Sequence, residues 1–446
     1  MAKTFQIGGI HPNDSKFSAN CPIEDFPLVP KVYISMNQHL GGPAIPVVEK
    51  GDQVQVGQLI AKPSGFISAP VHSSVSGKVA SIGPFPDILG NMCNTIVINV
   101  EEDQWVPEID RSPDIEREIK LSGPELIQAV AEKGIVGLGG ATFPANVKLS
   151  PPQGKTAEFI ILNGTECEPF LTSDHRIMLE RTEEILIGGE IIRRALGTEK
   201  GYVGIEINKP DAIEKMQKLV GNFPGWEIVP LKKRYPQGGE KQLIDAITGR
   251  QVPSMALPID VGAVVHNVGT ALAIYEAVQK NKPLIDNVLT VTGTNTAKQK
   301  NYRVRIGTPI QALIDSVGGP DEDIAKLISG GPMMGRVIVR PEAPTLKGTS
   351  SVLMLTEAET LRKKPSACIR CAKCVSACPM GLEPYLLYRM ARANRLEDLE
   401  KHFIQDCIEC GSCMYTCPAN IALLDMIRLK KGKVLGMIRS RAQAAS

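Results

Sequence analysis

Two cysteine runs near the C-terminus have the spacing of iron–sulfur ligands. They are Cys368-x-x-Cys371-x-x-Cys374-x-x-x-Cys378-Pro379 and Cys407-x-x-Cys410-x-x-Cys413-x-x-x-Cys417-Pro418. Three thiolates at two-residue gaps let one loop hold three corners of a cubane, while the fourth cysteine, before proline, ligates the other cluster. The spacing therefore predicts two [4Fe–4S] clusters with crossed ligand sets. These sets are Cys368, Cys371, Cys374 and Cys417 for one cluster, and Cys407, Cys410, Cys413 and Cys378 for the other.

Structural zinc is the alternative for these cysteines, because Cys₄ zinc sites also use Cys-x-x-Cys pairs. Zinc needs only two such pairs per ion, so it explains neither the third cysteine of each run nor the final Cys-Pro. The chain starts without a signal-peptide pattern, so we expect a reducing compartment in which clustered thiols bind metal instead of forming disulfides. The isolated Cys21, Cys93 and Cys167 are expected to be packed thiols.

Composition limits the function classes that the chain can serve. With 446 residues, 43% hydrophobic and 22% charged, it should form two to four globular domains. A net charge of +2 and 4% aromatic residues disfavour a nucleic-acid binder. No stretch approaches the about 18 apolar residues of a membrane span, so membrane association is expected only through partners.

Hydrophobic patterning upstream of the cysteines indicates β and α/β modules. Residues 1–100 contain short strands around G-D-x-V-x-x-G-Q and A-P-V…G-K-V, which resemble the flattened barrel of lipoyl and biotinyl carriers. Lys62 is the only candidate for modification there; its Ala-Lys-Pro-Ser context departs from the carrier pattern and favours a barrel without a prosthetic group. In residues 121–280, apolar strands alternate with helices, which predicts a parallel or mixed sheet.

The remaining parts of the chain are a small strand-rich unit and the cysteine region. Residues 284–345 contain strands around one short helix, which favours a β-grasp module. Residues 360–430 contain the cysteine motifs with helical periodicity at 382–402 and 421–430, which is typical of a helical ferredoxin domain. From Met426 onward, six Lys or Arg residues and no acid follow. This basic tail is either simply solvated or docks on anionic lipid or an acidic partner.

Four segments of the 121–280 region could approach a flat or phosphorylated ligand. They are G-L-G-G-A-T-F-P-A-N-V-K at 137–148, N-G-T-E-C-E-P at 163–169, Y-P-Q-G-G-E-K-Q at 235–242 and V-H-N-V-G-T at 265–270. In order and spacing they resemble the FMN- and NADH-binding fold of the flavin subunit of respiratory complex I. They are less acidic than that pattern, with Glu240-Lys241 in place of paired acids and His266-Asn267 in place of paired asparagines.

The whole chain, from residue 5 to about residue 430, is similar to the family of Rnf C subunits (RnfC). These are peripheral subunits of a membrane ferredoxin:NAD⁺ oxidoreductase that couples electron transfer to Na⁺ or H⁺ translocation. The resemblance implies a multidomain α/β protein. Its expected domains are an N-terminal barrel-sandwich β domain, an α/β FMN/NADH-binding domain, a β-grasp module of SLBB type and a C-terminal α-helical ferredoxin domain.

The resemblance also implies the residues that bind cofactors. Gly137, Gly139, Gly140 and Ala141 would line FMN, with Lys148 near its ribityl or phosphate end. Phe143 would stack on the nicotinamide nucleotide, Asn163 and Glu166 would contact FMN, and Glu168 would contact the nucleotide. Gly238, Gly239 and Glu240 would form a second wall. Asn267 and Thr270, with His266 beside them, would hold the FMN phosphate at a helix N-terminus.

The implied chemistry links the two-electron carrier NAD(H) to one-electron clusters through FMN, and no side-chain acid or base needs to be catalytic. Expected partners are the other subunits of a membrane complex, including a ferredoxin-like Fe–S subunit, and no nucleic acid. The expected location is the cytoplasmic face of a bacterial membrane. Two alternatives remain open: a flavin-free relay or scaffold, and the cobalamin-reducing flavoprotein of bacterial microcompartments, which has similar modules.

Overall fold

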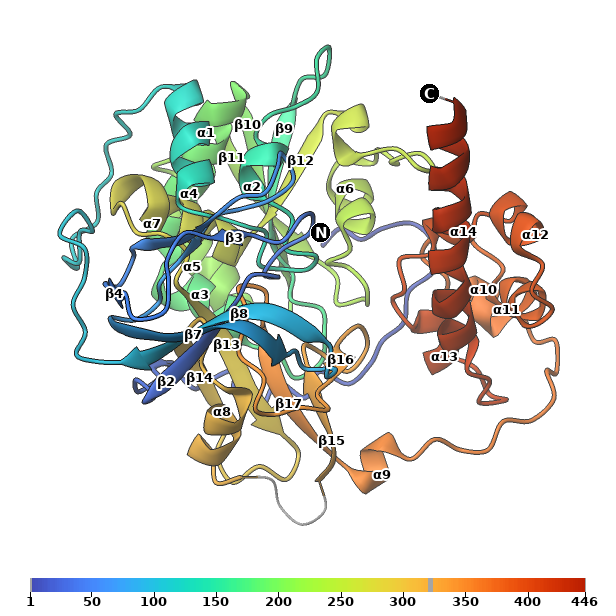
Figure 1. The fold of residues 1–446 in the computed structure, drawn as a ribbon. Helices are drawn as coiled ribbons and strands as arrows, with labels where there is room; N and C mark the ends of the chain where they lie inside the picture. The colour runs from blue at the N-terminus through green and yellow to red at the C-terminus, as the bar shows by residue number, and fades with distance from the viewer. Residues whose placement is uncertain (1, 320–323, 446) are drawn as a thin grey trace.

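The computed structural model describes residues 2–319 and 324–445. Figure 1 shows a body of packed sheets and helices, with a helical C-terminal lobe standing to one side. The extended chain that follows α9 (Glu357–Thr360) joins the two parts, and the N-terminal segment passes along the lobe before it returns to the body. No helix of the described residues has both the length and the apolar character needed to cross a membrane.

The N-terminal barrel consists of two small antiparallel sheets. One has the strand order β2-β8-β7-β4 and the other β3-β5-β6. Their bounds are β2 Lys31–Ser35, β8 Met92–Val100, β7 Gly77–Pro86, β4 Gln53–Val54, β3 Ile45–Pro46, β5 Leu59–Lys62 and β6 Val71–His72. Alternate residues of β2, Val32 and Ile34, point into a core that Ile60, Ile96 and Ile98 complete.

The second part is a parallel sheet with the order β11-β10-β9-β12. Its strands are β9 Phe159–Gly164, β10 Lys200–Glu206, β11 Trp226–Leu231 and β12 Ala263–Asn267. The helices are α1 Gly123–Glu132, α2 Ala145–Lys148, α3 Ser173–Glu180, α4 Thr182–Leu196, α5 Pro210–Val220, α6 Glu240–Thr248 and α7 Val268–Gln279, with the 3-10 turn η1 Pro258–Val261. Separate cores lie on the two faces, which explains why the first four residues of β9, Phe159 to Leu162, are all apolar.

The β-grasp sheet has the order β1-β14-β13-β17-β15-β16. Its elements are β1 Ile23–Asp25, β13 Asp286–Gly293, β14 Lys300–Arg305, α8 Ile310–Ser316, β15 Ile324–Ser329, β16 Arg336–Val337 and β17 Ser351–Thr356. β1 and β17 therefore join this sheet from outside residues 284–345. Between the barrel and the parallel sheet, the buried Lys347 donates from Nζ to the carbonyls of Pro70 (2.9 Å) and Gly134 (2.7 Å). Burial lowers the pKa of Lys347 to about 7.

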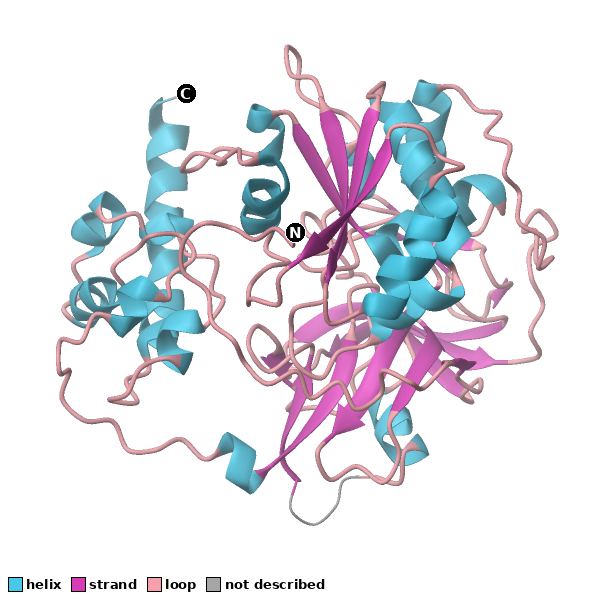
Figure 2. Ribbon diagram, turned by 180° about the vertical axis from the view of Figure 1, so that it is seen from behind, coloured by secondary structure: helices cyan, strands magenta, loops and turns pink. Residues whose placement is uncertain are grey.

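The C-terminal lobe is formed by short helices around one long helix (Figure 2). They are α10 Lys373–Ser376, α11 Pro384–Arg392, α12 Leu396–Lys401, η2 Ile404–Asp406, α13 Ser412–Tyr415 and α14 Leu423–Ala445. The helical pattern predicted at 382–402 forms two helices, because Asn394 adopts a left-handed conformation with φ 54°. The pattern predicted at 421–430 corresponds to α14, which continues well past residue 430.

Candidate functional site

The expected FMN segments meet at the carboxyl edge of the parallel sheet, where open α/β folds bind ligands. Asn163 lies near the end of β9, and His266 and Asn267 end β12. The loop with Gly238 and Gly239 leads into α6 beside them. The structure therefore brings together segments that are up to 132 residues apart in the sequence, as between Leu138 and Thr270.

The glycine-rich loop is tied to the N-terminus of α7. Asn267 caps this helix, with its Oδ1 accepting the Gly269 N–H at 2.7 Å, and the Leu138 N–H donates to Thr270 Oγ1 at 2.9 Å. Gly139, Gly140 and Ala141 are exposed above this turn. An open glycine loop at a helix N-terminus is suited to a phosphate-bearing ligand.

Lys148, the last residue of α2, contacts residues of α6 and β12. Its Nζ donates to Glu240 Oε1 at 2.7 Å and to the Val265 carbonyl at 3.1 Å. His266, next to that carbonyl, is buried, and its pKa is lowered to about 3 by burial and by the Lys148 charge. Within the described residues, His266 Nε2 has no hydrogen-bond partner. The site thus offers one cation and one neutral imidazole.

Asn163 and Gly238 form a second wall. Asn163 Nδ2 donates to the Gly238 carbonyl at 2.9 Å, and its Oδ1 accepts from the Thr165 hydroxyl at 2.6 Å. A Cβ at Gly238 would lie 2.5 Å from Thr165 Oγ1, so only glycine fits without rearrangement. Cys167 Sγ accepts the Gly238 N–H at 3.4 Å, and burial raises the pKa of this thiol.

The two glutamates predicted to contact cofactors bind backbone amides in this structure. Glu166 accepts the N–H groups of Asp174 (2.8 Å) and His175 (3.3 Å) at the start of α3. Glu168 accepts those of Met333 (3.0 Å) and Met334 (2.8 Å), in the turn between β15 and β16. Burial raises the pKa of Glu168 to about 7. Their cofactor contacts remain predictions.

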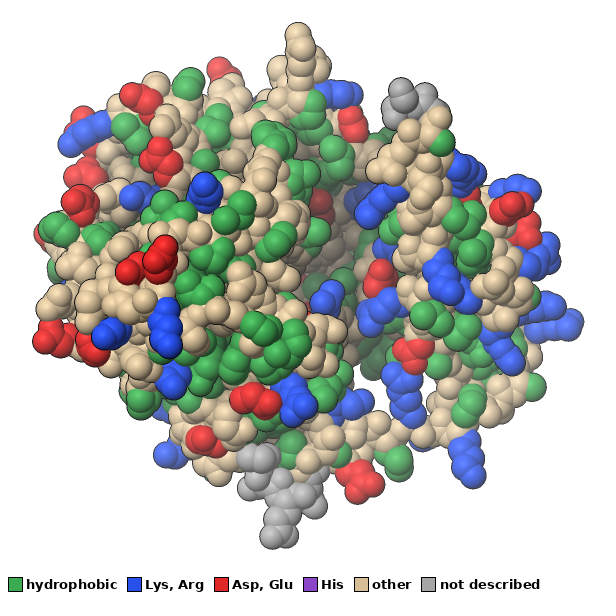
Figure 3. All heavy atoms as spheres, viewed as in Figure 1, with side chains coloured by type: hydrophobic (Ala, Val, Ile, Leu, Met, Phe, Trp, Pro, Cys, Tyr) green, Lys and Arg blue, Asp and Glu red, His purple; other side chains and the backbone are tan. Residues whose placement is uncertain are grey.

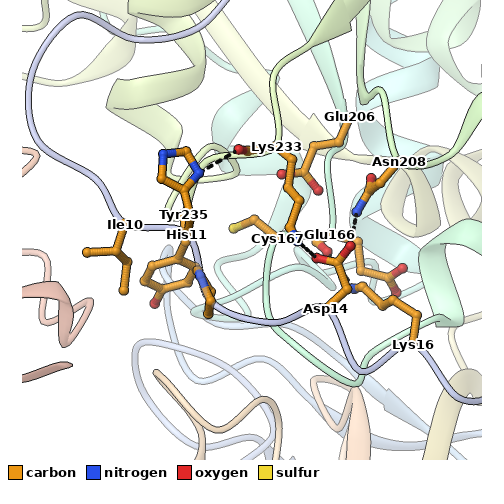
Figure 4. A pocket seen from close by; sticks show the side chains of 11 residues that line it. Ile10, His11, Asp14, Lys16, Glu166, Cys167, Glu206, Asn208, Lys233 and Tyr235 are labelled. Carbon is orange, nitrogen blue, oxygen red and sulfur yellow. Dashed lines mark hydrogen bonds and ion pairs between the residues drawn. The ribbon is translucent and has the colours of Figure 1, made fainter. Parts of the chain in front are cut away.

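The N-terminal segment supports this loop from behind (Figure 4). Lys16 Nζ donates to the carbonyls of Glu166, Glu168 and Leu171 at 2.6–2.9 Å. Asp14 pairs with Lys233 at 2.7 Å. The cavity between these groups measures about 10 Å³, which is room for about one water molecule. This pocket is therefore a support of the Glu166–Glu168 loop and is too small to hold a cofactor.

Cysteines of one motif pack beside cysteines of the other motif. The Ser366 N–H donates to the Ala419 carbonyl at 2.9 Å, which brings the first motif to the end of the second. The side chains of Cys374, Cys417 and Cys413 pack in one hydrophobic group, and those of Cys378 and Cys407 pack in another. Burial, with the neighbouring Cys410 and Cys378 thiols, raises the pKa of Cys407 to about 11. The Cys374–Cys417 and Cys378–Cys407 neighbours agree with the crossed ligand sets, whereas Cys413, assigned to the second set, packs beside two members of the first.

The ligand sets themselves remain predictions. Among the described residues, no three ligating side chains converge closely enough to hold a metal ion. The donor chemistry nevertheless suits an iron–sulfur cluster, because the side chains gathered there are thiols. Cys410, Cys413 and Cys378 are buried, whereas Cys368 and Cys371 are exposed.

The buried cysteines lie against the parallel-sheet domain. The Tyr235 hydroxyl donates to the Cys410 carbonyl at 2.9 Å, and Gln242 Nε2 donates to the Pro379 carbonyl at 3.2 Å. The Gly9 N–H donates to the Ala377 carbonyl at 2.9 Å. At Gly8, with φ 72°, a Cβ would collide with the Cys378 carbonyl, so the N-terminal segment passes this motif in direct contact.

The β15–β16 turn completes this junction. Its sequence is G-G-P-M-M-G at 330–335; Met333 packs beside Cys167 and Cys410, and a Cβ at Gly331 would collide with the Glu168 carboxylate. No sequence pattern marks Tyr235, Gln242 or this turn as junction residues. The glycine and methionine run of the turn was the only local signal.

Family models cover all four parts of the chain. They describe an RnfC barrel sandwich hybrid domain at 3–103, a Nuo51 FMN-binding domain at 130–276, an SLBB domain at 288–337 and a 4Fe-4S dicluster domain at 364–421. The predicted multidomain fold class and its cofactor classes, FMN and [4Fe–4S] clusters, are confirmed. Fold and site define an iron–sulfur flavoprotein of electron transfer.

Curated relatives identify the family. The chain is 47% identical over 90% of its length to the C subunit of a proton-translocating ferredoxin:NAD(+) oxidoreductase complex of Clostridium ljungdahlii, covering 88% of that protein. It is 43% identical over 97% to the subunit of the Na(+)-translocating complex of Acetobacterium woodii, also covering 97% of it. The chain belongs to the family of C subunits of Rnf-type, ion-translocating ferredoxin:NAD⁺ oxidoreductase complexes.

A solved structure shares the fold. A chain of an NAD+-reducing [NiFe]-hydrogenase in the H2-reduced state superposes with a TM-score of 0.50 at 17% identity. The match covers 71% of this chain and 62% of that chain. Family membership favours the Rnf-type function over the relay and cobalamin-reductase alternatives, and it makes the other subunits of such a complex partners of this chain.

Proposed function

We propose that this chain binds FMN and NAD(H) at the carboxyl edge of the parallel sheet and exchanges electrons with an Rnf-type complex through two [4Fe–4S] clusters. When bound, FMN exchanges hydride with NAD(H) and single electrons with iron–sulfur clusters. The flavin-binding residues are proposed from the resemblance and their placement at this edge. They are Gly137, Gly139, Gly140, Ala141, Lys148, Asn163, Gly238, Gly239, Glu240, His266, Asn267 and Thr270.

The chain's own residues bind and orient in this proposal. The capped N-terminus of α7, with Thr270 fixed to the Leu138 N–H, receives the FMN phosphate. Lys148 adds positive charge, and Glu240 and the Val265 carbonyl hold its Nζ in place. The exposed Gly139–Ala141 loop leaves an open side for the nicotinamide nucleotide, with Phe143 at its end.

The Tyr235 contact is the single observation that carries this proposal, and it supports one order of the two clusters. The Tyr235 hydroxyl connects the loop of the flavin wall directly to the Cys410 carbonyl. The cluster of Cys407, Cys410, Cys413 and Cys378, called the inner cluster below, is therefore proposed to exchange electrons with FMN. The cluster of Cys368, Cys371, Cys374 and Cys417, the outer cluster, exchanges them with the rest of the complex.

In the cell we place the chain at the cytoplasmic face of the membrane, held by other subunits that include a ferredoxin-like Fe–S protein. Electrons run from ferredoxin to NAD⁺ in the ion-translocating direction. The curated relatives are named for Na⁺ or proton translocation, and either ion is compatible with a subunit that supplies only the electron path.

Anaerobic reconstitution with iron, sulfide and FMN tests this function. We expect about eight iron atoms per chain from the two motifs, one retained FMN, and reduction of both chromophores by NADH in visible and EPR spectra. Thr270→Val should lose FMN while keeping its iron, because the hydroxyl that fixes the glycine loop to α7 is removed. An iron content near four, zinc in place of iron, or NADH that reduces neither chromophore would contradict the proposal.

A further inference from the structure

The chain around the outer cluster is an exposed basic loop. From residue 361 to 373 every residue is exposed, including Cys368 and Cys371. Between Glu359 and Glu383 the sequence contains five Lys or Arg residues and no acid. They are Arg362, Lys363, Lys364, Arg370 and Lys373, and we call the 361–373 segment the outer loop.

The charges of the outer loop are largely unneutralised. Arg362 pairs with Asp425 at 2.5 Å. Lys363, Lys364, Arg370 and Lys373 make no ion pair with any residue that the structure describes. Positive charges near a cluster edge and without internal partners remain available to an approaching protein.

The loop also exposes apolar side chains. Leu361 is 72% and Ile369 is 68% exposed, although both are large aliphatic residues. An apolar contact surrounded by positive charge is the composition of a small, transient protein interface. Electron-transfer encounters bury little area, so a loop of this size is sufficient for one.

Charge asymmetry of the whole chain favours the same surface. Residues 357–446 contain fifteen Lys or Arg residues against nine Asp or Glu, whereas residues 1–356 contain 35 against 39. Figure 3 shows Lys and Arg side chains gathered over the C-terminal lobe. In contrast, four of the six basic residues of α14 bind within this lobe: Arg428 and Lys431 to Glu409, Lys430 to Asn394 and Arg441 to Glu400.

We propose that the outer loop, residues 361–373, is the docking surface for an acidic one-electron carrier protein that exchanges electrons with the outer cluster. This proposal rests on the proposed cluster order. Steering by complementary charge brings the partner's redox centre to Cys368 and Cys371, where the chain leaves the cluster uncovered. One electron passes per encounter, so one centre is oxidised as the other is reduced.

Stopped-flow mixing tests the surface independently of the flavin. The clusters of the reconstituted chain are reduced with dithionite, freed of excess reductant and mixed with an oxidised, acidic two-[4Fe–4S] ferredoxin as probe. For Lys363→Glu/Lys364→Glu we expect the second-order rate constant at low salt to fall by about tenfold or more, with a weaker dependence on ionic strength. These two lysines lie outside the cysteine motif, and iron analysis verifies that the variant retains its clusters.

The matched control is Lys433→Glu/Arg439→Glu, which reverses two charges on α14 of the same lobe. We expect its rate constant to stay within about threefold of the unchanged chain, because only long-range charge is altered. Equal losses in the two variants, or no loss in the Lys363/Lys364 variant, would overturn the docking surface. If vesicles containing phosphatidylglycerol bind the unchanged chain and the Lys363/Lys364 variant abolishes this binding without slowing electron exchange, the loop binds membrane and the proposal is wrong. Failure of NADH to reduce the clusters would instead contradict the proposed function. The rate of electron exchange with the ferredoxin would still be measurable, because dithionite reduces the clusters in that experiment.

Discussion

The two cysteine motifs have the same spacing but lie in opposite surroundings. In the second motif Cys410 and Cys413 are buried, and Tyr235 and the turn at 330–335 hold this part of the lobe against the flavin-binding domain. In the first motif Cys368 and Cys371 are exposed on a loop that no other domain covers. Motif spacing therefore specifies the cofactor, whereas the tertiary contacts of each motif determine whether it lies against the flavin-binding domain or at the surface.

The largest expected difference is in resistance to cluster loss. Mild oxidation with ferricyanide in the presence of a chelator should release iron in two phases, about half in each. The fast phase should be at least about tenfold faster, since exposed ligands are attacked first. Cys371→Ala should lack the fast phase when iron release is followed by a colorimetric chelator. A single phase in the unchanged chain would show that the two surroundings do not differ in protection.

Glu168→Gln should weaken the junction at the inner cluster. The amide replaces a carboxyl group that accepts two N–H bonds from Met333 and Met334, and each such hydrogen bond contributes about 1 kcal/mol. We expect slower cluster reduction by NADH and an altered EPR line of the inner cluster, with the KM for NADH unchanged. Glu125→Gln, on the exposed start of α1, is a suitable control. A raised KM with normal cluster reduction would instead support the nucleotide contact predicted from the resemblance.

Tyr235→Phe should have a smaller effect at the same junction. It removes the hydroxyl that donates to the Cys410 carbonyl, a hydrogen bond worth about 1 kcal/mol. FMN content, iron content and the rate of flavin reduction by NADH should be unchanged, while subsequent cluster reduction slows several-fold in stopped-flow traces. Tyr388→Phe, beside Cys374 and Cys417, should leave that rate unchanged. If cluster reduction slowed equally in Tyr235→Phe and Tyr388→Phe, the Tyr235 contact would have no specific role in electron transfer to the clusters.

Lys431→Met should have the smallest effect. Lys431 Nζ donates to the Cys407 carbonyl at 2.7 Å and pairs with Glu409 at 3.2 Å. Partly exposed ion pairs contribute less than about 1 kcal/mol, so folding should be almost unaffected. Removing a positive charge beside the inner cluster should lower its reduction potential slightly, as measured by EPR-monitored titration. The potential of the outer cluster should not change; an equal shift of both clusters would contradict the assignment.

Local patterns predicted the parts of the molecule that are formed by local sequence. The alternation of strands and helices predicted for residues 121–280 corresponds to the parallel sheet and its flanking helices. The cysteine spacing by itself predicts iron–sulfur ligands. These features depend on residues within a few positions of one another, which is the range at which periodicity and motifs are informative.

Contacts between distant segments were beyond local patterns. Residues 8–10 join Tyr235 to Ala377 by backbone hydrogen bonds, which leave no side-chain pattern in the sequence. β1 has only three residues and is specified by its partner β14. Glu168 accepts hydrogen bonds from the amides of Met333 and Met334, which lie in another domain. Such pairings depend on domain packing, for which one sequence has no periodic signal.

Rapid-freeze EPR of two ligand variants is the sharpest test of the proposed order of the clusters. Cys371→Ala disrupts the outer cluster and Cys413→Ala the inner one, and each reconstituted variant with FMN bound is mixed with NADH and frozen within milliseconds to seconds. We expect NADH to reduce the inner cluster of Cys371→Ala at close to the original rate. The outer cluster of Cys413→Ala should stay oxidised over the same time. Rapid reduction in Cys413→Ala with loss of reduction in Cys371→Ala would contradict the proposed order.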